Sequence, residues 1–391
     1  MKVLAIGGGG SMGRAAVRTM KTFDFIEQVV LAGIDYDRAA RFASSLEDER
    51  FSAQYLDITN IEEMRLAIRE CDVVINSAGP FFRFGVPVLQ AAIDEGKHYC
   101  DICDDWEPTL EMIDLHQQAV DKGVTAVIGL GASPGIANML AMKASQQLDD
   151  VDTLYSAWRL SNAHNEDDGF FEKGEAAASA DAAAVHLVHC LTEKIPLVQD
   201  GVIEDHMPLE KRSFNYPGYG AIDLWSIGHP EAVTFPRKFP DLKNCMNGML
   251  GVEAIIDDLQ TIASHVREGA MTVDDAAAAL MSDGGREKRR ERLNEVEERD
   301  ALGIVAYAEG TKDGLPLRVG ATLKAVPAGG MSAVTGIPLA LFLPLLLNNK
   351  IQGTGVMSPE QAVDPDAFFE LLDGFTGAQG CGLTVTCESG I

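Results

Sequence analysis

The chain has 391 residues, 46% of them hydrophobic and 23% charged, a composition typical of globular proteins and not of disordered ones. One hydrophobic core rarely extends over so many residues, so two domains are expected. The formal net charge of −27 repels nucleic acids and anionic membranes, and we therefore expect neither as a partner. The seven cysteines, an odd number spread along the chain, favour a reducing, cytoplasmic location over a disulfide framework.

The N-terminal segment carries the most informative pattern. Residues 2–6 (KVLAI) are a short apolar run typical of a buried parallel strand, and a helical pattern begins at Arg14. Between them, Gly8, Gly10 and Gly13 have the G-x-G-x-x-G spacing. Such glycines allow a tight turn, the close approach of a pyrophosphate and close packing of the helix on the sheet. The N–H groups of the first helical turn then bind the phosphates, so the segment predicts a dinucleotide-binding site.

Further apolar runs continue the pattern. Residues 29–34 end at Asp35, about 20 residues after the last glycine, where an acid is expected to bind ribose hydroxyls. Four more strands are expected at 51–56, 72–77, 99–103 and 124–130. Helices are expected at 14–20, 38–46, 61–70, 85–96 and 108–122. Six strands alternating with helices predict an α/β fold with a Rossmann-type, doubly wound parallel sheet, in which ligands bind at the carboxyl ends of the strands.

The pattern changes after about residue 150. Strands are expected at 151–160, 202–209, 221–227, 303–309 and 315–324, and helices at 176–191, 251–267 and 287–299. The last two strands flank Thr311-Lys312-Asp313-Gly314, which contains the Asp-Gly pair of a hairpin turn. This region predicts an α+β domain with a largely antiparallel sheet.

The expected division of the chain follows. Residues 1–133 should form the dinucleotide-binding Rossmann domain, and 134–350 an inserted α+β domain for substrate binding and dimerisation. The segment 351–391 should pack back on the Rossmann domain. The apolar stretch 337–347 is about half the length of a membrane span and contains two prolines, so we expect a buried helix or an oligomer contact.

Motifs spread over nearly the whole chain carry a family resemblance. The two longest are INSAGPFFRFGVPVLQAAIDEGKHYCDI at 75–102 and GLGASPGIANMLA at 129–141. Shorter ones are SIGHPEAVTFPR at 226–237, GMSAVTGIP at 330–338 and GVMSPE at 355–360. With these motifs the chain resembles the saccharopine dehydrogenase-like family of NAD(P)-dependent oxidoreductases, which includes saccharopine reductase, lysine 6-dehydrogenase and carboxynorspermidine dehydrogenase.

The resemblance implies a homodimeric enzyme with a nucleotide-binding domain and an inserted substrate domain. It also implies hydride transfer between nicotinamide and a carbon bearing nitrogen, through an imine, in an amino acid or a polyamine-like amine. Two alternatives stay open. One is a reductase of a C=C or C=O bond, and the other is a non-catalytic sensor that binds NAD(P).

The expected cofactor contacts follow the strand ends. Gly8, Gly10, Ser11, Met12 and Gly13 should hold the pyrophosphate. A carboxylate at Asp35 accepts hydrogen bonds from ribose hydroxyls and repels a 2′-phosphate, which favours NAD, whereas relatives that resemble saccharopine reductase carry a Ser-Arg pair there. Arg38 keeps NADP as the alternative, because a guanidinium can bind a phosphate.

Two later turns complete the expected cofactor site. Asp57 and Ile58 follow the third strand where related folds bracket the adenine, although Asp57 could equally cap the helix that starts near Asn60. Ser77, Ala78, Gly79 and Pro80 follow the fourth strand and should run beside the nicotinamide ribose.

Candidate catalytic groups are those that can move a proton or hold a substrate charge. Asp101 follows the fifth strand with Asp104 and Asp105, and such clustered carboxylates raise one another's pKa, although Asp105 is better explained as a helix cap. His229 is the candidate acid or base of the second domain, and Arg159, with Arg237 as its alternative, could hold a substrate carboxylate.

No metal site is expected from the sequence. His186, His189 and Cys190 fall on one predicted helix, but no carboxylate joins them at ligand spacing, so packed helix residues are the preferred interpretation. Cys100 and Cys103 form a single C-x-x-C pair without a second pair, and redox or metal use of it is disfavoured.

Overall fold

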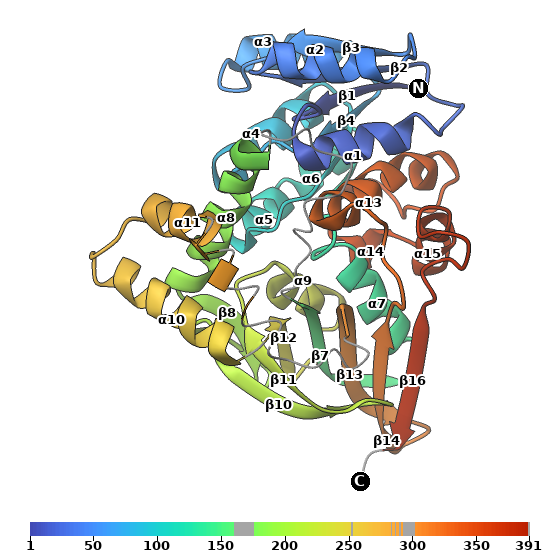
Figure 1. The fold of residues 1–391 in the computed structure, drawn as a ribbon. Coiled ribbons are helices and arrows are strands. Elements are labelled where there is room, and N and C mark those ends of the chain that lie inside the picture. Colours follow the sequence, from blue (N-terminus) through green and yellow to red (C-terminus); the bar gives the residue numbers. More distant parts are fainter. Residues whose placement is uncertain are drawn as a thin grey trace. The chain divides into compact units, whose positions relative to one another are not determined.

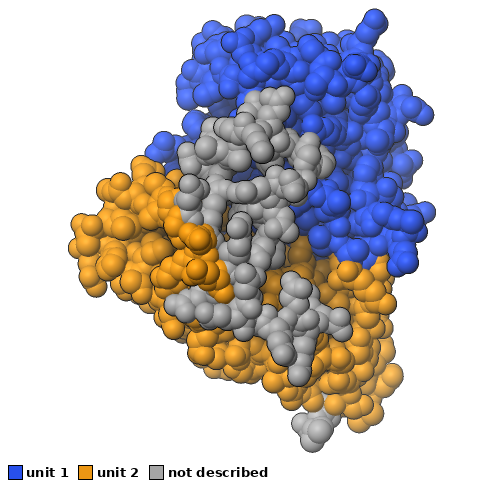
Figure 2. Space-filling model, in the orientation of Figure 1, with its two compact units in different colours: residues 1–136, 167–172, 325–381 blue, residues 137–166, 173–324, 382–391 orange. Residues whose placement is uncertain are grey.

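The computed structural model describes residues 1–159, 176–251, 253–282, 284–285, 287–288, 291 and 302–389. The chain forms two compact units, coloured separately in Figure 2. Unit 1 contains Met1–Ile136 and Ala325–Cys381. Unit 2 contains the described residues from 137 to 324 together with 382–389.

Unit 1 is built on a seven-stranded parallel sheet with the strand order β15-β6-β5-β4-β1-β2-β3 (Figure 1). Its strands are β1 (Lys2–Ile6), β2 (Gln28–Gly33), β3 (Phe51–Tyr55), β4 (Val73–Asn76), β5 (His98–Asp101), β6 (Thr125–Val127) and β15 (Gly355–Met357). Every neighbouring pair is parallel. The order reverses beside β1, as in a doubly wound nucleotide-binding sheet, which confirms the predicted Rossmann-type architecture. The strand β15 was not predicted.

Helices cover the sheet of unit 1. They are α1 (Ser11–Met20), α2 (Tyr36–Ser45), α3 (Ile61–Arg69), α4 (Phe81–Asp94), α5 (Trp106–Asp114), α6 (His116–Asp121), α13 (Gly330–Leu347), α14 (Pro359–Ala362) and α15 (Pro365–Asp373). Helix α3 packs beside α4 and α4 beside α5, while α1 packs on α13 and α13 on α15. Local signals fix several helix starts: the side chain of Asp35 caps α2 and that of Asn60 caps α3.

Helix α13 is the most apolar helix in the part of the chain that the structure describes. Its 18 residues are long and apolar enough to cross a membrane, yet 78% of them are buried inside the structure. It packs closely on α1, because a Cβ atom at Gly336 would lie 2.2 Å from the Met12 carbonyl oxygen and 2.8 Å from the Ala15 Cβ. The expected buried helix is confirmed, and it begins at Gly330, seven residues earlier than predicted.

Unit 2 is built on a nine-stranded mixed sheet. Seven strands follow the order β10-β11-β12-β7-β13-β14-β16, and β8 pairs with β12 and β9. The strands are β7 (Asp150–Arg159), β8 (Ile195–Gln199), β9 (Val202–His206), β10 (Lys211–Tyr216), β11 (Gly220–Ser226), β12 (Asn244–Leu250), β13 (Ile304–Lys312), β14 (Leu315–Thr322) and β16 (Thr384–Ser389). Among the described strands of this sheet, only β12 and β7 pair in parallel, so the predicted, largely antiparallel α+β arrangement is confirmed.

The helices of unit 2 form a separate core with the sheet. Helix α7 (Ile136–Ser145) starts at the boundary of the units, and α8 (Ala176–Thr192), α9 (Glu231–Lys238), α10 (Glu253–Arg267) and α11 (Val273–Met281) follow. Apolar side chains of α8, α10 and α11 form one cluster with Trp225 and Met249. The β13–β14 hairpin turns at Asp313 and Gly314, both with positive φ, as the Asp-Gly signal predicts. The helix expected at 287–299 lies mostly outside the described residues.

The chain passes between the two units more often than the expected ranges imply. Helix α13 belongs to unit 1, although it lies within 134–350, and 382–389 belong to unit 2, although they lie within 351–391. The division of the chain into domains at 1–133, 134–350 and 351–391 stays a prediction.

Candidate functional site

The glycine-rich turn follows β1 directly. Gly7 has a φ of +77° and donates its N–H to the Ala32 carbonyl oxygen at 2.8 Å, while the Gly10 N–H donates back to the Gly7 carbonyl oxygen at 2.8 Å. Gly10 is the N-cap of α1 and makes no side-chain capping hydrogen bond. The first-turn N–H groups of α1, at Ser11, Met12 and Gly13, therefore have no side-chain cap, as a phosphate-binding helix start requires.

Gly13 is the tightest position in this turn. A Cβ atom there would lie 2.2 Å from the Gly7 carbonyl oxygen and 2.8 Å from both the Gly8 Cα and the Ser77 Oγ. No side chain fits at such distances, so the third glycine of the motif is required by close packing between α1, the glycine turn and the end of β4.

Asp35 lies in the first turn after β2. Its carboxylate is exposed and accepts the Arg38 N–H at 3.0 Å, which caps α2. Farther along α2, the guanidinium groups of Arg14 and Arg18 lie 5.8 Å and 5.1 Å from the centre of the Phe42 ring. Burial and the neighbouring Arg14 lower the pKa of Arg18. Asp35 therefore lies directly after β2, where the sequence predicts a ribose-binding acid.

Asp57 follows β3 and forms a local turn. Its Oδ1 accepts the Thr59 N–H at 2.9 Å and the Thr59 hydroxyl at 2.7 Å, and these hydrogen bonds lower the pKa of Asp57. Asn60, and not Asp57, is the side chain that caps α3. Ile58 beside it is half-buried.

The turn after β4 is tied to the glycine-rich turn. Ser77 donates its N–H to the Ile6 carbonyl oxygen at 2.9 Å, and the Ala78 N–H donates to Oδ1 of Asn76 at 3.0 Å. Gly79-Pro80 is a cis peptide, and Pro80 is the N-cap of α4. Gly8–Gly13, Asp35, Asp57–Ile58 and Ser77–Pro80 thus follow the ends of β1, β2, β3 and β4 in unit 1, as the sequence predicts.

Asp101 ends β5 in the interior of unit 1, with 0% of its surface exposed. Its Oδ1 accepts the N–H groups of Cys103 at 3.0 Å and Gly129 at 2.7 Å, and its Oδ2 accepts the Tyr99 hydroxyl at 2.8 Å. Burial raises the pKa of Asp101 to about 6. A carboxyl enclosed in this way holds the turns after β5 and β6 in position. The expected role of Asp101 in proton transfer stays a prediction.

The Asp101 contacts extend to the turn beside the glycines. Tyr99 accepts a hydrogen bond from the Asn76 amide at 3.0 Å, and Asn76 in turn accepts the Ala78 N–H. One buried chain of hydrogen bonds therefore links the carboxyl ends of β4, β5 and β6. This network is not visible in the sequence, because its members lie on three separate strands.

The remaining candidates near Asp101 have structural explanations. Asp105 occupies the N-cap position of α5, but its carboxylate accepts the Phe82 N–H of α4 at 3.3 Å. Cys100 and Cys103 are both buried, and burial raises the pKa of each thiol well above its ordinary value. Thiols in such surroundings are not reactive, which agrees with the interpretation against a redox pair.

Arg159 and His229 belong to unit 2. Arg159 ends β7, where its Nε donates to the Leu302 carbonyl oxygen at 2.9 Å. His229 precedes α9 and is 5% exposed. Arg237, the predicted alternative to Arg159 for holding a substrate carboxylate, is exposed in the last turn of α9.

His229 lies in a buried polar group that the sequence alone did not reveal, the His229 cluster of His186, Cys190, His229 and Glu231. The Nε2 atoms of His229 and His186 are 3.4 Å apart, and the Cys190 Sγ lies 3.4 Å from His186 Nε2. On the other side, His229 Nδ1 lies 3.9 Å from Glu231 Oε2. The spacing of His186 and Cys190 on α8 was the only signal of this cluster in the sequence.

The fold and the glycine-rich turn define a Rossmann-type dinucleotide-binding protein with an appended α+β unit. Residues 3–127 match the family described as "Saccharopine dehydrogenase NADP binding domain", which supports a nicotinamide cofactor. These residues span all of the strands of unit 1 except β15. The predicted resemblance to the saccharopine dehydrogenase-like family is thus confirmed.

Two similar proteins extend this finding. The solved structure of apo saccharopine dehydrogenase (L-Glu forming) from Saccharomyces cerevisiae matches 100% of both chains with a TM-score of 0.64 and 17% identity, which shows a shared fold. Carboxynorspermidine synthase of Vibrio cholerae is 23% identical over 175 residues, 39% of this chain and 42% of that protein. The match therefore spans less than half the length of this curated relative.

Proposed function

We propose that the protein is an NAD(P)-dependent dehydrogenase or reductase that transfers a hydride at the C–N bond of an amino acid or a polyamine-like amine. The glycine-rich turn with its uncapped α1 is the observation that carries the proposal, because it provides a site for the pyrophosphate. The names of the two relatives, a saccharopine dehydrogenase and a carboxynorspermidine synthase, support a nitrogen-containing substrate. A cytoplasmic homodimer is part of the same proposal.

The proposed reaction oxidises the carbon next to the nitrogen. In this direction, the C–H bond would break, a bound nicotinamide would accept the hydride, and the amine nitrogen would release a proton as the C=N bond forms. Water then adds to the imine. Arg159 and His229 are the groups that we propose unit 2 contributes, and Asp101 is assigned a positioning role in place of a catalytic one.

The choice between NAD and NADP follows from the surroundings of Asp35. Its exposed carboxylate supports NAD, because it would repel a 2′-phosphate. Arg38, three residues after Asp35 in the first turn of α2, supports the alternative NADP, because a guanidinium group can bind phosphate. We propose NAD as the preferred cofactor. Replacing Asp35→Ser should then lower the ratio of kcat/KM for NAD to that for NADP by at least about tenfold, roughly 1.4 kcal/mol.

The test is turnover with both cofactors. The full chain is incubated with NAD or NADP and a panel that includes lysine, saccharopine and polyamines, and the absorbance of the reduced cofactor is followed. Reduction with an amine, and faster reduction with NAD than with NADP, is the expected result. A clear NADP preference would overturn the cofactor assignment.

A second result would be that no amine of the panel causes cofactor reduction although binding of the dinucleotide is confirmed independently. It would refute the amine dehydrogenase and favour the non-catalytic sensor. Oxidation of reduced cofactor by C=C or C=O compounds, with no activity on amines, would instead favour the other reductase.

A further inference from the structure

The sheet of unit 2 curls so that its first strand meets strands near the opposite edge. In the strand order β10 stands far from β14, yet the two strands are in contact. The ring of Phe214 on β10 has its centre 5.7 Å from that of Tyr155 on β7 and 4.5 Å from that of Tyr307 on β13. In the turn after β10, the Gly218 N–H donates to Oε1 of Glu388 on β16 at 2.9 Å. One face of the sheet is therefore the inside of a partly closed barrel.

A cavity of about 270 Å³ lies toward one end of this barrel. Its lining side chains include alternate residues of several strands, which share one face of a sheet. They include Thr153 and Tyr155 of β7, Arg212 and Phe214 of β10, and Tyr307 and Glu309 of β13. Small-molecule sites are common in the mouths of β-barrels, so we examine what this cavity can bind.

Three aromatic rings form the floor of the cavity. Tyr155 and Tyr307 are direct cross-strand neighbours, and their rings stack with centres 6.0 Å apart and planes at 28°. The Phe214 ring packs against both of them. Aromatic rings in such a layer offer a flat apolar surface to a ligand and attract positive charge at their faces.

Arg212 supplies the positive charge of the cavity, and no other Lys or Arg stands among the described residues that line it. Its Nη2 donates to Oε1 of Gln199 at 3.0 Å, and Gln199 also lines the cavity. The same nitrogen lies 3.6 Å from Oε2 of Glu210, an exposed pair that solvent screens. The guanidinium is thus oriented by Gln199 at the rim and can bind a carboxylate with two hydrogen bonds.

Glu309 supplies a negative charge at the rim. Its exposed carboxylate accepts the Tyr307 hydroxyl at 3.2 Å, and the exposed Asp200 adds a second carboxylate to the lining. Burial raises the pKa of the Tyr155 hydroxyl to about 12, while Arg212 lowers that pKa and Glu309 raises it. Both charges therefore act on one ring of the floor, and a ligand on the rings lies between opposite charges.

The cavity is separate from Arg159, which we propose contacts the substrate. Arg159 ends β7, six residues after Thr153, which places the two roughly 20 Å apart at about 3.3 Å per residue. A cavity of about 270 Å³ lies just below the usual range of roughly 300–1,000 Å³ for ligand sites. It fits a molecule of amino-acid size, which does not reach Arg159, and excludes a dinucleotide.

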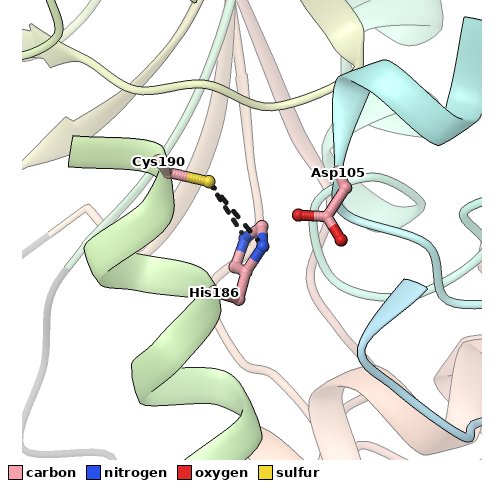
Figure 3. A group of neighbouring side chains, drawn as sticks. All are labelled: Asp105, His186 and Cys190. Atoms are coloured by element: carbon pink, nitrogen blue, oxygen red, sulfur yellow. Dashed lines mark hydrogen bonds between the residues drawn. The ribbon is translucent and has the colours of Figure 1, made fainter. Parts of the chain in front are cut away.

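The His229 cluster is separate from the cavity as well. Trp158 packs on the His229 ring with centres 5.8 Å apart, and it points to the opposite face of β7 from Tyr155, three residues earlier. Figure 3 shows the Cys190 thiol and the His186 imidazole of this cluster facing each other on α8. The cluster therefore belongs to the other side of the sheet.

We propose that the cavity binds a small zwitterion of amino-acid size, with its carboxylate on Arg212, its ammonium group on Glu309 and an apolar side chain over the aromatic floor. A zwitterion satisfies both charges of the rim, whereas a ligand with one charge leaves the other side chain without a partner. The site lies entirely in unit 2 and does not depend on the proposed dehydrogenase activity.

The experiment uses three probes that share a phenyl group and differ in charge. The full-length protein, without cofactor, is titrated by calorimetry with L-phenylalanine, 3-phenylpropionate and phenethylamine. We expect one equivalent of phenylalanine to bind. Each singly charged probe should bind at least about tenfold more weakly, because one charge-assisted interaction is lost.

Variants locate the site through the probe that each one affects. Arg212→Gln should weaken phenylalanine binding by at least about tenfold and leave phenethylamine binding unchanged. Glu309→Gln should weaken phenylalanine binding by a similar factor and leave phenylpropionate binding unchanged. Lys211→Gln is the matched control, because Lys211 lies on the other face of β10, where it pairs with Asp223 at 2.9 Å. It should bind all three probes as the unaltered chain does.

Three results would overturn the proposal. The first is a folded, unaltered protein that binds none of the probes, and the second is equal affinity for all three. The third is phenylalanine affinity that is retained in Arg212→Gln or in Glu309→Gln, since the amino acid would then occupy another site, such as that of the substrate. Circular dichroism identifies variants that do not fold, and for these the probe series on the unaltered protein decides.

Discussion

At the scale of single residues, Gly13 is the most tightly packed glycine of the turn that we propose binds the dinucleotide. Gly13→Ala places a methyl group 2.2 Å from the Gly7 carbonyl oxygen, so the glycine turn must move. We expect a loss of about 1–3 kcal/mol in the free energy of unfolding, as for other overpacked positions, and at least tenfold weaker dinucleotide binding. Urea unfolding and fluorescence titration with the reduced cofactor measure the two effects.

The control for this variant is Gly374→Ala. Gly374 follows α15 with helical φ and ψ, and a Cβ atom there would make only an ordinary contact, 3.4 Å from the Leu371 carbonyl oxygen. It should change neither stability nor affinity by more than a few tenths of a kcal/mol. Unchanged dinucleotide affinity in Gly13→Ala would refute the assignment of the site.

Asp101 gives a residue-scale prediction about pH. Its folded-state pKa of about 6 lies above the ordinary value of about 3.9, so its contribution to stability is complete below pH 4 and is lost as the pH rises through 6. Asp101→Asn has no such proton to lose. Raising the pH from 5 to 8 should therefore lower the free energy of unfolding of the unaltered chain by about 1 kcal/mol more than that of Asp101→Asn.

The matching variant Asp101→Ala tests the positioning role. It leaves the buried N–H groups of Cys103 and Gly129 and the Tyr99 hydroxyl without their acceptor, which should cost about 2–4 kcal/mol of stability at any pH. Asp101→Asn should keep turnover because its amide oxygen can still accept both N–H groups. Complete loss of turnover in a folded Asp101→Asn protein would contradict the positioning role and restore a catalytic one.

At the scale of elements, helix α13 packs on α1, the helix that we propose binds the pyrophosphate. Gly336→Ala would place its Cβ 2.2 Å from the Met12 carbonyl oxygen in α1. We expect about 1–3 kcal/mol of destabilisation together with weaker dinucleotide binding, because α1 must shift. Leu347→Ala, at an exposed position of the same helix, should leave affinity unchanged. Unaltered affinity in Gly336→Ala would show that the two helices are not coupled in this way.

The elements also show how far the sequence could predict the fold. Buried apolar runs such as Lys2–Ile6 and Val73–Asn76 identified the Rossmann strands because parallel strands are hydrophobic on both faces. β12 (Asn244–Leu250) was not predicted, because the half-buried Asn244 and the buried Asn247 interrupt its apolar pattern. Tertiary hydrogen bonds with other strands satisfy both amides. β15 is too short, at three residues, to carry a pattern.

The sequence could predict only those parts of the candidate site whose residues lie close together along the chain. Gly8, Gly10, Gly13 and Asp35 lie within one strand–helix–strand unit, so spacing was enough to find them. The His229 cluster joins α8 to a segment about forty residues later, a contact that depends on tertiary packing. Asp101 was correctly placed at a strand end, but its burial follows from neighbouring strands that the sequence does not reveal.

At the scale of the whole molecule, the net charge of −27 predicts that salt stabilises the protein. Repulsion among carboxylates favours the unfolded chain, and the Debye length falls from about 10 Å at 0.1 M salt to about 3 Å at 1 M. Tm should rise by roughly 2–4 °C for each kcal/mol of repulsion removed. Thermal unfolding in increasing NaCl measures the effect, and a Tm that falls with salt would contradict it.

The central claim is that the protein transfers a hydride from a carbon bearing nitrogen to a nicotinamide. The most direct measurement uses an amine that carries deuterium on that carbon, incubated with the protein and the oxidised cofactor. We predict that mass spectrometry finds one deuterium in the reduced cofactor, at C4 of the nicotinamide. Reduced cofactor without deuterium, or none formed by a protein that binds the dinucleotide, would contradict the claim.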